Sequence, residues 1–230
     1  MGKAIVLLSG IFLFFCRVNS VNAQNYKILH QFEWKTNDGS FPEGSLSLKG
    51  GTLYGMTNLG GKDGEYGFGI IFSIKSDGTD YQILHNFGGY PDDGGYPTGS
   101  LTSDGVRLYG MTSGGGYHYD GTIFSLDPAN PSDSYTVIHE FPDQSIKNDG
   151  ESPLGSLLLY NDRLYGMTSE GGEDSSSGHG VIFSIKPDGT DYEILHRFRI
   201  DIFYLLKKAI QCLSKGKPPM NNRTDSVSKN

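Results

Sequence analysis

The chain has 230 residues, a net charge of −7 and 36 % hydrophobic residues, which is enough apolar material for a packed core. Its 14 tyrosines and 13 phenylalanines argue against wholesale disorder, and its 33 glycines follow no three-residue period, which excludes collagen. The acidic balance gives no electrostatic support for nucleic-acid binding, so no nucleic-acid partner is expected.

The N-terminal residues 1–23 have the pattern of a secretory signal peptide. A basic start is followed by an apolar run over residues 4–15, and small residues ending at Ala23 suit cleavage before Gln24. The apolar run is shorter than the ~20 residues that a membrane span needs. We expect a protein that is secreted, periplasmic or at the cell surface, with an uncleaved N-terminal anchor as the alternative.

The two cysteines make an internal disulfide impossible after cleavage. Cys16 lies in the signal peptide and Cys212 in the C-terminal tail, so the mature chain keeps a single thiol. One thiol also excludes a cysteine-type zinc site. The fold must therefore rely on its core and its sheet hydrogen bonds.

Residues 24–198 form a strongly acidic tandem repeat with 24 acidic and 10 basic residues. Leu-Tyr-Gly-Met-Thr occurs three times and Gly-Ser-Leu three times, each at spacings of 55 and 56 residues. An Ile/Val-Leu/Ile-His-x-Phe segment occurs four times, the first within residues 26–32, ahead of the first unit. Fixed self-similarity at this period is typical of arrays, solenoids and propellers. The full units lie near residues 44–87, 99–141 and 155–198.

Each unit is predicted to form four short antiparallel strands. Gly-Gly and Asp-Gly pairs between β-rich runs favour tight hairpins, and no segment of residues 24–198 shows sustained helical periodicity. Four antiparallel strands in about 55 residues make a propeller blade, so we predict an all-β partial β-propeller with a leading strand at 26–32. In the first unit the expected strands are 45–49, 53–58, 70–75 and 81–87.

Three glycines inside predicted strands, Gly55, Gly110 and Gly166, are expected where another backbone approaches closely, near the propeller axis. Apolar residues on both strand faces fit a sheet that is sandwiched between neighbouring blades. Propellers close with four to eight blades, so three units leave the ring incomplete. Self-association through the open repeat edge is therefore one expected kind of partnership.

These motifs resemble the GloVer-type tandem repeat. The pattern runs Leu-Tyr-Gly-Met-Thr, Gly-Gly, Gly-x-Gly-x-Ile-Phe-Ser-Ile-Lys and Asp-Gly-Thr-Asp-Tyr, and it covers residues 26–198. The resemblance implies an exported bacterial β-repeat protein with a propeller-like fold, from a family described with a choice of C-terminal anchors. It implies no catalytic residues. The chain departs from the family in having three full units and no recognisable anchoring domain.

The C-terminal residues 199–230 differ in character, with seven basic and two acidic residues. Asp201 as an N-cap and an apolar stripe behind it predict a helix over 201–214, followed by disordered residues. Alternatively, a frameshift or a truncated gene introduced this tail. A third hypothesis places the basic helix on a membrane surface, the one membrane contact considered for the mature chain.

Four histidines occupy one repeat position: His30, His85, His139 and His196. Equivalent positions on successive blades are spread apart, whereas metal ligands converge at ~2 Å from one ion, so these residues are expected to be structural. His118 and His179 lie singly in glycine-rich loops without ligand spacing, and those loops lack a phosphate-binding motif. We predict no metal site and no cofactor.

Two further groups were considered for binding. Four aspartates lie in Asp-Gly-Thr-Asp turns, where bonding to their own backbone competes with calcium coordination as the explanation: Asp77, Asp80, Asp188 and Asp191. Four tyrosines depart from the repeat consensus in predicted loops: Tyr90, Tyr96, Tyr117 and Tyr119. On one rim they could stack on sugar rings or contact a protein, with loop packing as the alternative.

No carboxylate pair or nucleophile motif marks a catalytic site. We therefore expect a non-enzymatic binding or surface-interaction module for an unidentified protein or glycan. The alternative is a propeller-type carbohydrate-active enzyme, a glycoside hydrolase or lyase, which would need two close carboxylates in a pocket with at least one perturbed pKa.

Overall fold

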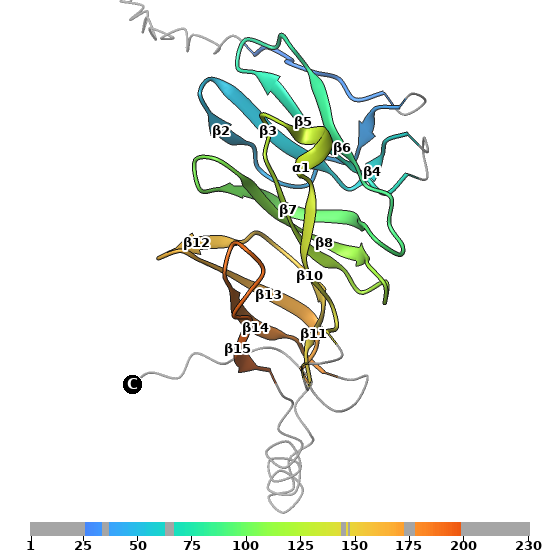
Figure 1. Ribbon diagram of the computed structural model, residues 1–230. Coiled ribbons are helices and arrows are strands. Elements are labelled where there is room, and N and C mark those ends of the chain that lie inside the picture. The colour runs from blue at the N-terminus through green and yellow to red at the C-terminus, as the bar shows by residue number, and fades with distance from the viewer. Residues whose placement is uncertain are drawn as a thin grey trace, which may run out of the picture.

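The computed structural model shows three main antiparallel sheets that follow one another in chain order (Figure 1). The predicted signal peptide and the predicted helix over 201–214 lie outside the described residues. None of the helices in the described part has the length and apolar character needed to cross a bilayer. The structure describes residues 26–33, 37–62, 67–143, 146, 148–172 and 178–198.

Blade 1 confirms the four-strand prediction. Its strands pair in the order β2-β3-β5-β6, with every neighbour antiparallel. Leu53 lies opposite Ile74 and Thr57 opposite Ile70, so the β-branched run of β5 is buried against the pentapeptide strand. The elements are β2 (Ser47–Lys49), β3 (Thr52–Thr57), β5 (Ile70–Lys75) and β6 (Gln82–Asn86).

Blade 2 has the same order with one local difference. The four-residue helix α1 (Pro131–Ser134) stands where the other two units have an Asp-Gly turn. The first N–H of a helix has no acceptor within the helix, so the missing N–H of Pro131 costs nothing at this position. This favours a short helical turn directly after Asn130. The strands are β7 (Gly94–Ser103), β8 (Leu108–Gly115), β9 (Thr122–Leu126) and β10 (Thr136–Glu140).

Blade 3 repeats the pattern with its first strand divided in two. The continuous β7 of blade 2 corresponds to β11 and β12, which both pair with β13. Blade 1 shows the same division, because β1 (Gly39–Ser40) pairs with β4 (Leu59–Gly60) ahead of β2. The strands are β11 (Gly150–Pro153), β12 (Leu158–Tyr160), β13 (Arg163–Gly171), β14 (Val181–Ile185) and β15 (Glu193–Arg197).

The core lies between the blades, as the two apolar faces predict. Met56, Ile71 and Phe87 of blade 1 pack with Leu108 and Phe124 of blade 2 in one buried cluster. A second cluster joins blade 2 to blade 3 through the equivalent positions, including Met111 and Phe183. Blade 2 thus buries both of its faces because it has a neighbour on each side.

The expectation for the strand glycines was wrong about their neighbour. A Cβ on Gly55 would lie 2.6 Å from the Phe72 ring, and a Cβ on Gly110 would lie 2.5 Å from the Phe124 ring. The space is therefore taken by a phenylalanine from the adjacent strand of the same blade, not by a second backbone. The backbones of neighbouring blades meet instead at Gly44 and Gly99, where a Cβ on Gly44 would lie 1.8 Å from the Gly99 carbonyl oxygen.

The segment 26–32 lies against blade 1 but is not a strand, which corrects the predicted leading strand. Phe32 packs edge-on against Phe72, with 5.3 Å between ring centroids, and Leu29 joins the same cluster. A strand needs a hydrogen-bonded neighbour, and the described residues place none beside this segment. Its side chains occupy the places that the last strand of a preceding blade would fill.

Candidate functional site

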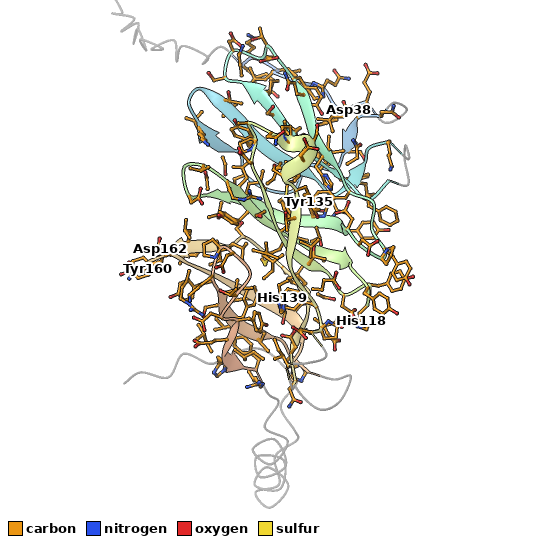
Figure 2. The ribbon with its side chains drawn as sticks, viewed as in Figure 1. Asp38, His118, Tyr135, His139, Tyr160 and Asp162 are labelled. Atoms are coloured by element: carbon orange, nitrogen blue, oxygen red, sulfur yellow. The ribbon has the colours of Figure 1, made fainter. Side chains whose placement is uncertain are left out.

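Three exposed tyrosines gather on the rim of blade 2. Tyr90 follows β6, whereas Tyr117 and Tyr119 come from the loop between β8 and β9. The rings of Tyr90 and Tyr119 are stacked, with 4.5 Å between their centroids, and the centroids of Tyr90 and Tyr117 are 6.1 Å apart. His118 meets Tyr117 edge-on at 5.1 Å, and Figure 2 shows where it lies beside the sheets. We call Tyr90, Tyr117 and Tyr119 the rim tyrosines.

The backbone of the β8–β9 loop holds these rings in place. The Gly116 N–H donates to the Asp93 carbonyl at 2.7 Å, which ties the loop to the segment after Tyr90. Tyr119 itself has a φ of 68°, a left-handed conformation that is uncommon for a bulky residue. Such strain persists where the surrounding structure imposes it, and here it turns the ring toward Tyr90.

Tyr96, the fourth predicted tyrosine, does not join the rim tyrosines. It packs edge-on against Phe68 with 5.4 Å between centroids. Its φ of 57° is shared by Phe41 and Ser152 at the same repeat position, so this conformation belongs to the blade. The structure therefore brings together three of the four tyrosines and gives Tyr96 a packing role.

A shallow hollow of about 520 Å³ begins at Tyr117, one of the rim tyrosines, and runs along blade 2 toward blade 3. It combines ring faces from Tyr117 and His118 with the carboxylates of Glu140 and Asp143. Aromatic faces beside hydrogen-bond acceptors suit a ligand that has both C–H surfaces and hydroxyl groups. The other lining residues are Ile138, His139, Pro142 and Gly189.

Three acidic residues lie close together where blades 2 and 3 meet, outside the lining of this hollow. Burial raises the pKa of Asp120, and the nearby charge of Glu170 raises it further. Burial also raises the pKa of Glu151, with added repulsion from Asp120 and Glu170. Glu151 and Glu170 are paired across β11 and β13. These carboxylates are therefore perturbed by one another and by burial, as like charges are when held together.

The repeated histidines join successive blades. His85 of blade 1 stacks on Tyr135 of blade 2 at 3.7 Å between ring centroids, and its Nε2 lies 2.9 Å from Asp93 Oδ2. His30 stands in the same relation to Tyr81 and Asp38, with a centroid distance of 3.8 Å and an Nε2–Oδ2 distance of 2.8 Å. We call each His–Asp–Tyr set an inter-blade clasp.

The third clasp is the most buried and the least regular. His139 stacks on Tyr192 at 4.1 Å, and the Tyr192 hydroxyl donates to Asp149 Oδ1 at 2.6 Å. His139 Nε2 lies 3.3 Å from Asp149 Oδ2, but the alignment does not meet hydrogen-bond geometry, so this nitrogen has no partner among the described residues. The expected structural role of these histidines fits their contacts.

Asp38 and Asp93 of the clasps each accept several hydrogen bonds, and these hydrogen bonds lower the pKa of their carboxyl groups. Burial acts to raise the pKa of Asp38, but hydrogen bonds from Tyr81, His30 and two backbone N–H groups outweigh it and lower the pKa. Asp93 shows the same balance with His85 and Tyr135. Burial and the adjacent carboxylate raise the pKa of Tyr81. The clasp is therefore held as a carboxylate with a neutral phenol.

The clasp partners of the histidines were missed by the sequence analysis, although a spacing marks them. Tyr81 follows Asp38 by 43 residues, and Tyr192 follows Asp149 by the same 43. Tyr135 follows Asp93 by 42 residues, so the offset is nearly constant, which in a tandem repeat indicates a contact that recurs. No group of three or more histidine, cysteine, aspartate or glutamate residues is placed to hold a metal ion in the described part of the chain.

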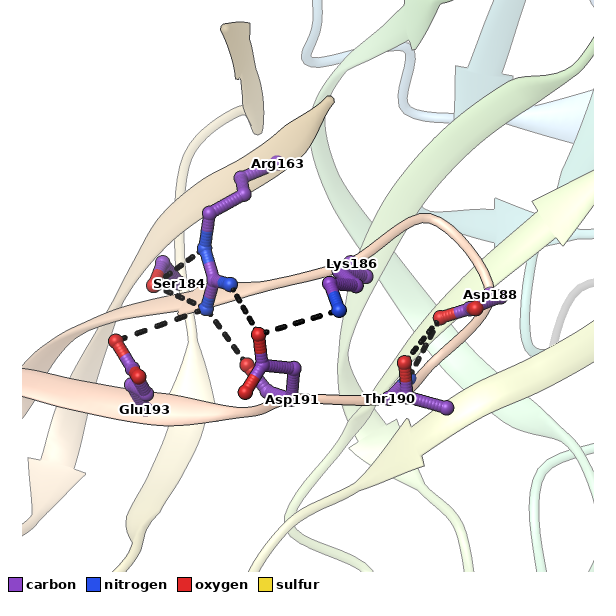
Figure 3. A network of polar contacts seen from close by, with 7 residues as sticks. All are labelled: Arg163, Ser184, Lys186, Asp188, Thr190, Asp191 and Glu193. Atoms are coloured by element: carbon purple, nitrogen blue, oxygen red, sulfur yellow. Dashed lines mark hydrogen bonds and ion pairs between the residues drawn. The ribbon is translucent and has the colours of Figure 1, made fainter. Parts of the chain in front are cut away.

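In each Asp-Gly-Thr-Asp turn the first aspartate accepts hydrogen bonds from the threonine of the same turn. Asp188 Oδ1 accepts from the Thr190 N–H at 2.9 Å and from the Thr190 hydroxyl at 2.7 Å, and Asp77 does the same with Thr79. Asp191 forms ion pairs with Arg163 and Lys186, and these cations lower the pKa of its carboxyl group (Figure 3). These contacts are those of turn-forming aspartates.

A family model described as the Gloeobacter/Verrucomicrobia repeat matches residues 16–216. No curated protein matches the chain. Among solved structures, the nidogen/laminin complex matches at 18 % identity with a TM-score of 0.40, over 65 % of this chain and 43 % of that one. A structure described as TolB from Agrobacterium tumefaciens matches at 14 % identity with a TM-score of 0.41, over 68 % of this chain and 50 % of that one. The chain spans half or less of the length of either.

Proposed function

Because the chain belongs to the Gloeobacter/Verrucomicrobia repeat family and is built from propeller-like blades, we propose that it is a non-enzymatic binding module that acts after export and recognises glycans. Export rests on the pattern of residues 1–23. The observation that carries glycan recognition is the exposed stacked pair of Tyr90 and Tyr119, which lies next to Tyr117, the rim tyrosine that lines the hollow.

The chemistry of the hollow supports a sugar better than an apolar ligand. A pyranose ring offers a C–H face that an exposed phenol ring can cover, while its hydroxyls donate to carboxylates such as Glu140. Among the described residues the lining holds no lysine or arginine, and its two acidic residues, Glu140 and Asp143, accept hydrogen bonds from hydroxyl groups. Neutral glycans are the favoured class.

A glycan array with the full chain tests this proposal. Tyr119→Ala and Tyr90→Ala are expected to weaken binding of the best neutral glycan by about tenfold each, as loss of one aromatic contact does. Tyr26→Ala is the matched control, because Tyr26 is exposed but belongs to the segment before blade 1. Equal binding by the rim variants and the control would contradict the proposal.

The raised pKa of Asp120 and of Glu151 favours the competing hypothesis of a carbohydrate-active enzyme. Neither residue lines the hollow, which favours binding over turnover. Reducing-sugar release from the glycans that bind is the deciding measurement. Turnover that is lost in Glu151→Gln or Asp120→Asn would establish the enzyme and overturn the non-enzymatic assignment.

A further inference from the structure

Several contacts recur from blade to blade, and each series stops at blade 3. A Cβ on Gly44 would lie 1.8 Å from the Gly99 oxygen, and a Cβ on Gly99 would lie 2.0 Å from the Gly155 oxygen. A Cβ on Gly155 would meet nothing within 4 Å. Gly155, the third glycine of the series, has a φ of +85°, close to the +68° of Gly99, but no described residue of another blade lies against it.

The serines beside these glycines form a parallel series. The Ser45 N–H donates to Ser100 Oγ at 2.7 Å, and the Ser100 N–H donates to Ser156 Oγ at 2.8 Å. Within the described residues the series has no further member, so the Ser156 N–H and the Ser45 Oγ are its two unmatched ends. One end is a donor and the other an acceptor, as a continuation of the series requires.

The outward face of blade 3 is apolar, and it is exposed in the described part of the chain. Met167 is 53 % exposed, whereas the equivalent Met56 and Met111 are 5 % and 1 % exposed beneath the next blade. Phe198 is exposed where Phe87 is buried. The remaining exposed apolar residues at next-blade positions are Leu158, Tyr160 and Leu195.

Blade 1 lacks a complete blade against its opposite face in the described part of the chain. Leu46 is half exposed, although Leu101 and Leu157 at the same position are buried. Asp38 and Tyr81 of blade 1 form the receiving half of a clasp, which His30 occupies from the segment 26–32. His196 of blade 3 is the histidine that would complete such a clasp on a following blade. It is exposed, and in the described part of the chain its only ring contact is with Phe198.

The segment that occupies blade 1 has nearly the sequence of the strand that lacks a partner. Residues 26–32 read Tyr-Lys-Ile-Leu-His-Gln-Phe and residues 192–198 read Tyr-Glu-Ile-Leu-His-Arg-Phe. The first is a lone segment with exposed Tyr26 and Ile28, whereas the second is anchored in a complete sheet. The two can therefore occupy the same place on blade 1, but not together.

We propose that blade 3 of one copy of this chain docks on blade 1 of a second copy, with His196 displacing His30 from Asp38 and Tyr81. Two copies related by a twofold axis then contribute six blades, within the four to eight that close a propeller. The same interface forms twice, and every series of glycine, serine and clasp contacts becomes continuous. The second copy is the fitting occupant because it carries the complementary half of each series.

Disulfide capture tests the proposed contact directly. A chain with Ser45→Cys is mixed with a chain carrying Ser156→Cys, and both chains also carry Cys16→Ser and Cys212→Ser. A covalent heterodimer is expected on mild oxidation, because the two serines become neighbours in the ring. The control is a single chain with Ser45→Cys and Ser100→Cys, which should close an internal disulfide at the same kind of contact. Cross-linking in the control alone would overturn the proposal.

Sedimentation velocity over a range of concentrations tests assembly without a covalent trap. Wild type is expected to equilibrate between monomer and dimer, and His30→Ala with Phe32→Ala should raise the dimer fraction by loosening the competing segment. Met167→Asp and Gly155→Ala should give monomers. Val106→Asp and Gly105→Ala are their controls, because Val106 is exposed in a turn and Gly105 has a φ of +96° with open space around it.

Each outcome decides for or against the closed pair. A dimer that is lost in Met167→Asp and Gly155→Ala but kept in both controls supports it. A monomer at every concentration in the His30→Ala/Phe32→Ala double variant, shown folded by circular dichroism, overturns it. Larger oligomers that grow with concentration also overturn it, because they indicate an open-ended chain of contacts in place of a ring.

Discussion

The imidazole of His85 lies flat on the phenol ring of Tyr135, with 3.7 Å between centroids and 7° between planes, although the two residues belong to different blades. Asp93 lies beside both and takes hydrogen bonds from the histidine, the phenol and two backbone N–H groups. This inter-blade clasp recurs at each blade boundary that the structure describes. It links the last strand of one unit to the next unit through polar contacts at the edge of an apolar core.

Tyr192→Phe should destabilise the fold by about 1–3 kcal/mol, because it removes a hydroxyl that donates to the buried carboxylate of Asp149 at 2.6 Å. The ring and its stacking on His139 are kept. Urea unfolding followed by circular dichroism gives the change in free energy. Tyr119→Phe is the matched control, since Tyr119 is exposed, lies outside the proposed contact between copies and should leave stability unchanged. Equal stability of the two variants would show that the clasp hydroxyl contributes nothing.

Stability should fall on both the acidic and the alkaline side. The pKa values of Asp38 and Asp93 are lowered in the folded state, so their contribution is present above the unfolded value of about 3.9 and is lost as the pH falls through the folded pKa. The pKa values of Tyr81 and Tyr192 are raised, so their contribution is present below about 10 and is lost as the pH rises further. Thermal melting from pH 2 to 12 measures both limbs, and a flat alkaline limb would contradict the second.

Gly99→Ala should cost about 2 kcal/mol or more beyond Gly105→Ala. Both glycines have positive φ, at +68° and +96°, so both substitutions carry the backbone cost of roughly 1–2 kcal/mol. At Gly99 the new Cβ would also lie 2.0 Å from the Gly155 oxygen and would force the blades apart. Denaturant unfolding of the two variants isolates that contact. Equal free energies of unfolding for the two variants would mean that blades 2 and 3 move apart without a loss of stability.

Glu151→Gln should stabilise the chain at pH 7 by about 0.5 kcal/mol, because burial and the charges of Asp120 and Glu170 raise the pKa of Glu151. The raised pKa means that the folded state disfavours the charged form, so the gain should vanish as the pH falls toward 4. Melting temperatures at pH 7 and pH 4 provide the measurement. Glu193→Gln serves as the control at an exposed glutamate near Arg163. Destabilisation at pH 7 would indicate that Glu151 has an attractive partner.

Contacts within a unit were predictable, and contacts between units were less so. The strand ranges of blade 1 follow from β-rich runs and Gly-Gly or Asp-Gly turns, because hairpins join residues that are neighbours in sequence. The rim tyrosines were recognised as departures from the repeat, but their stacking depends on the left-handed turn at Tyr119. Asp93 was missed because the histidine that it binds, His85, belongs to the preceding blade.

The sequence by itself determined that this protein is a repeat of three four-stranded units, because period, turn residues and strand patterns are local properties of the chain. Only the tertiary structure decided how the units meet. Within blade 1 it replaced the expected backbone neighbour of Gly55 with the ring of Phe72. Between blades it placed the close backbone contact at Gly44 and Gly99, and it joined His85 to an aspartate and a tyrosine of the next blade. These relations depend on the angle and distance between blades, which no single repeat encodes.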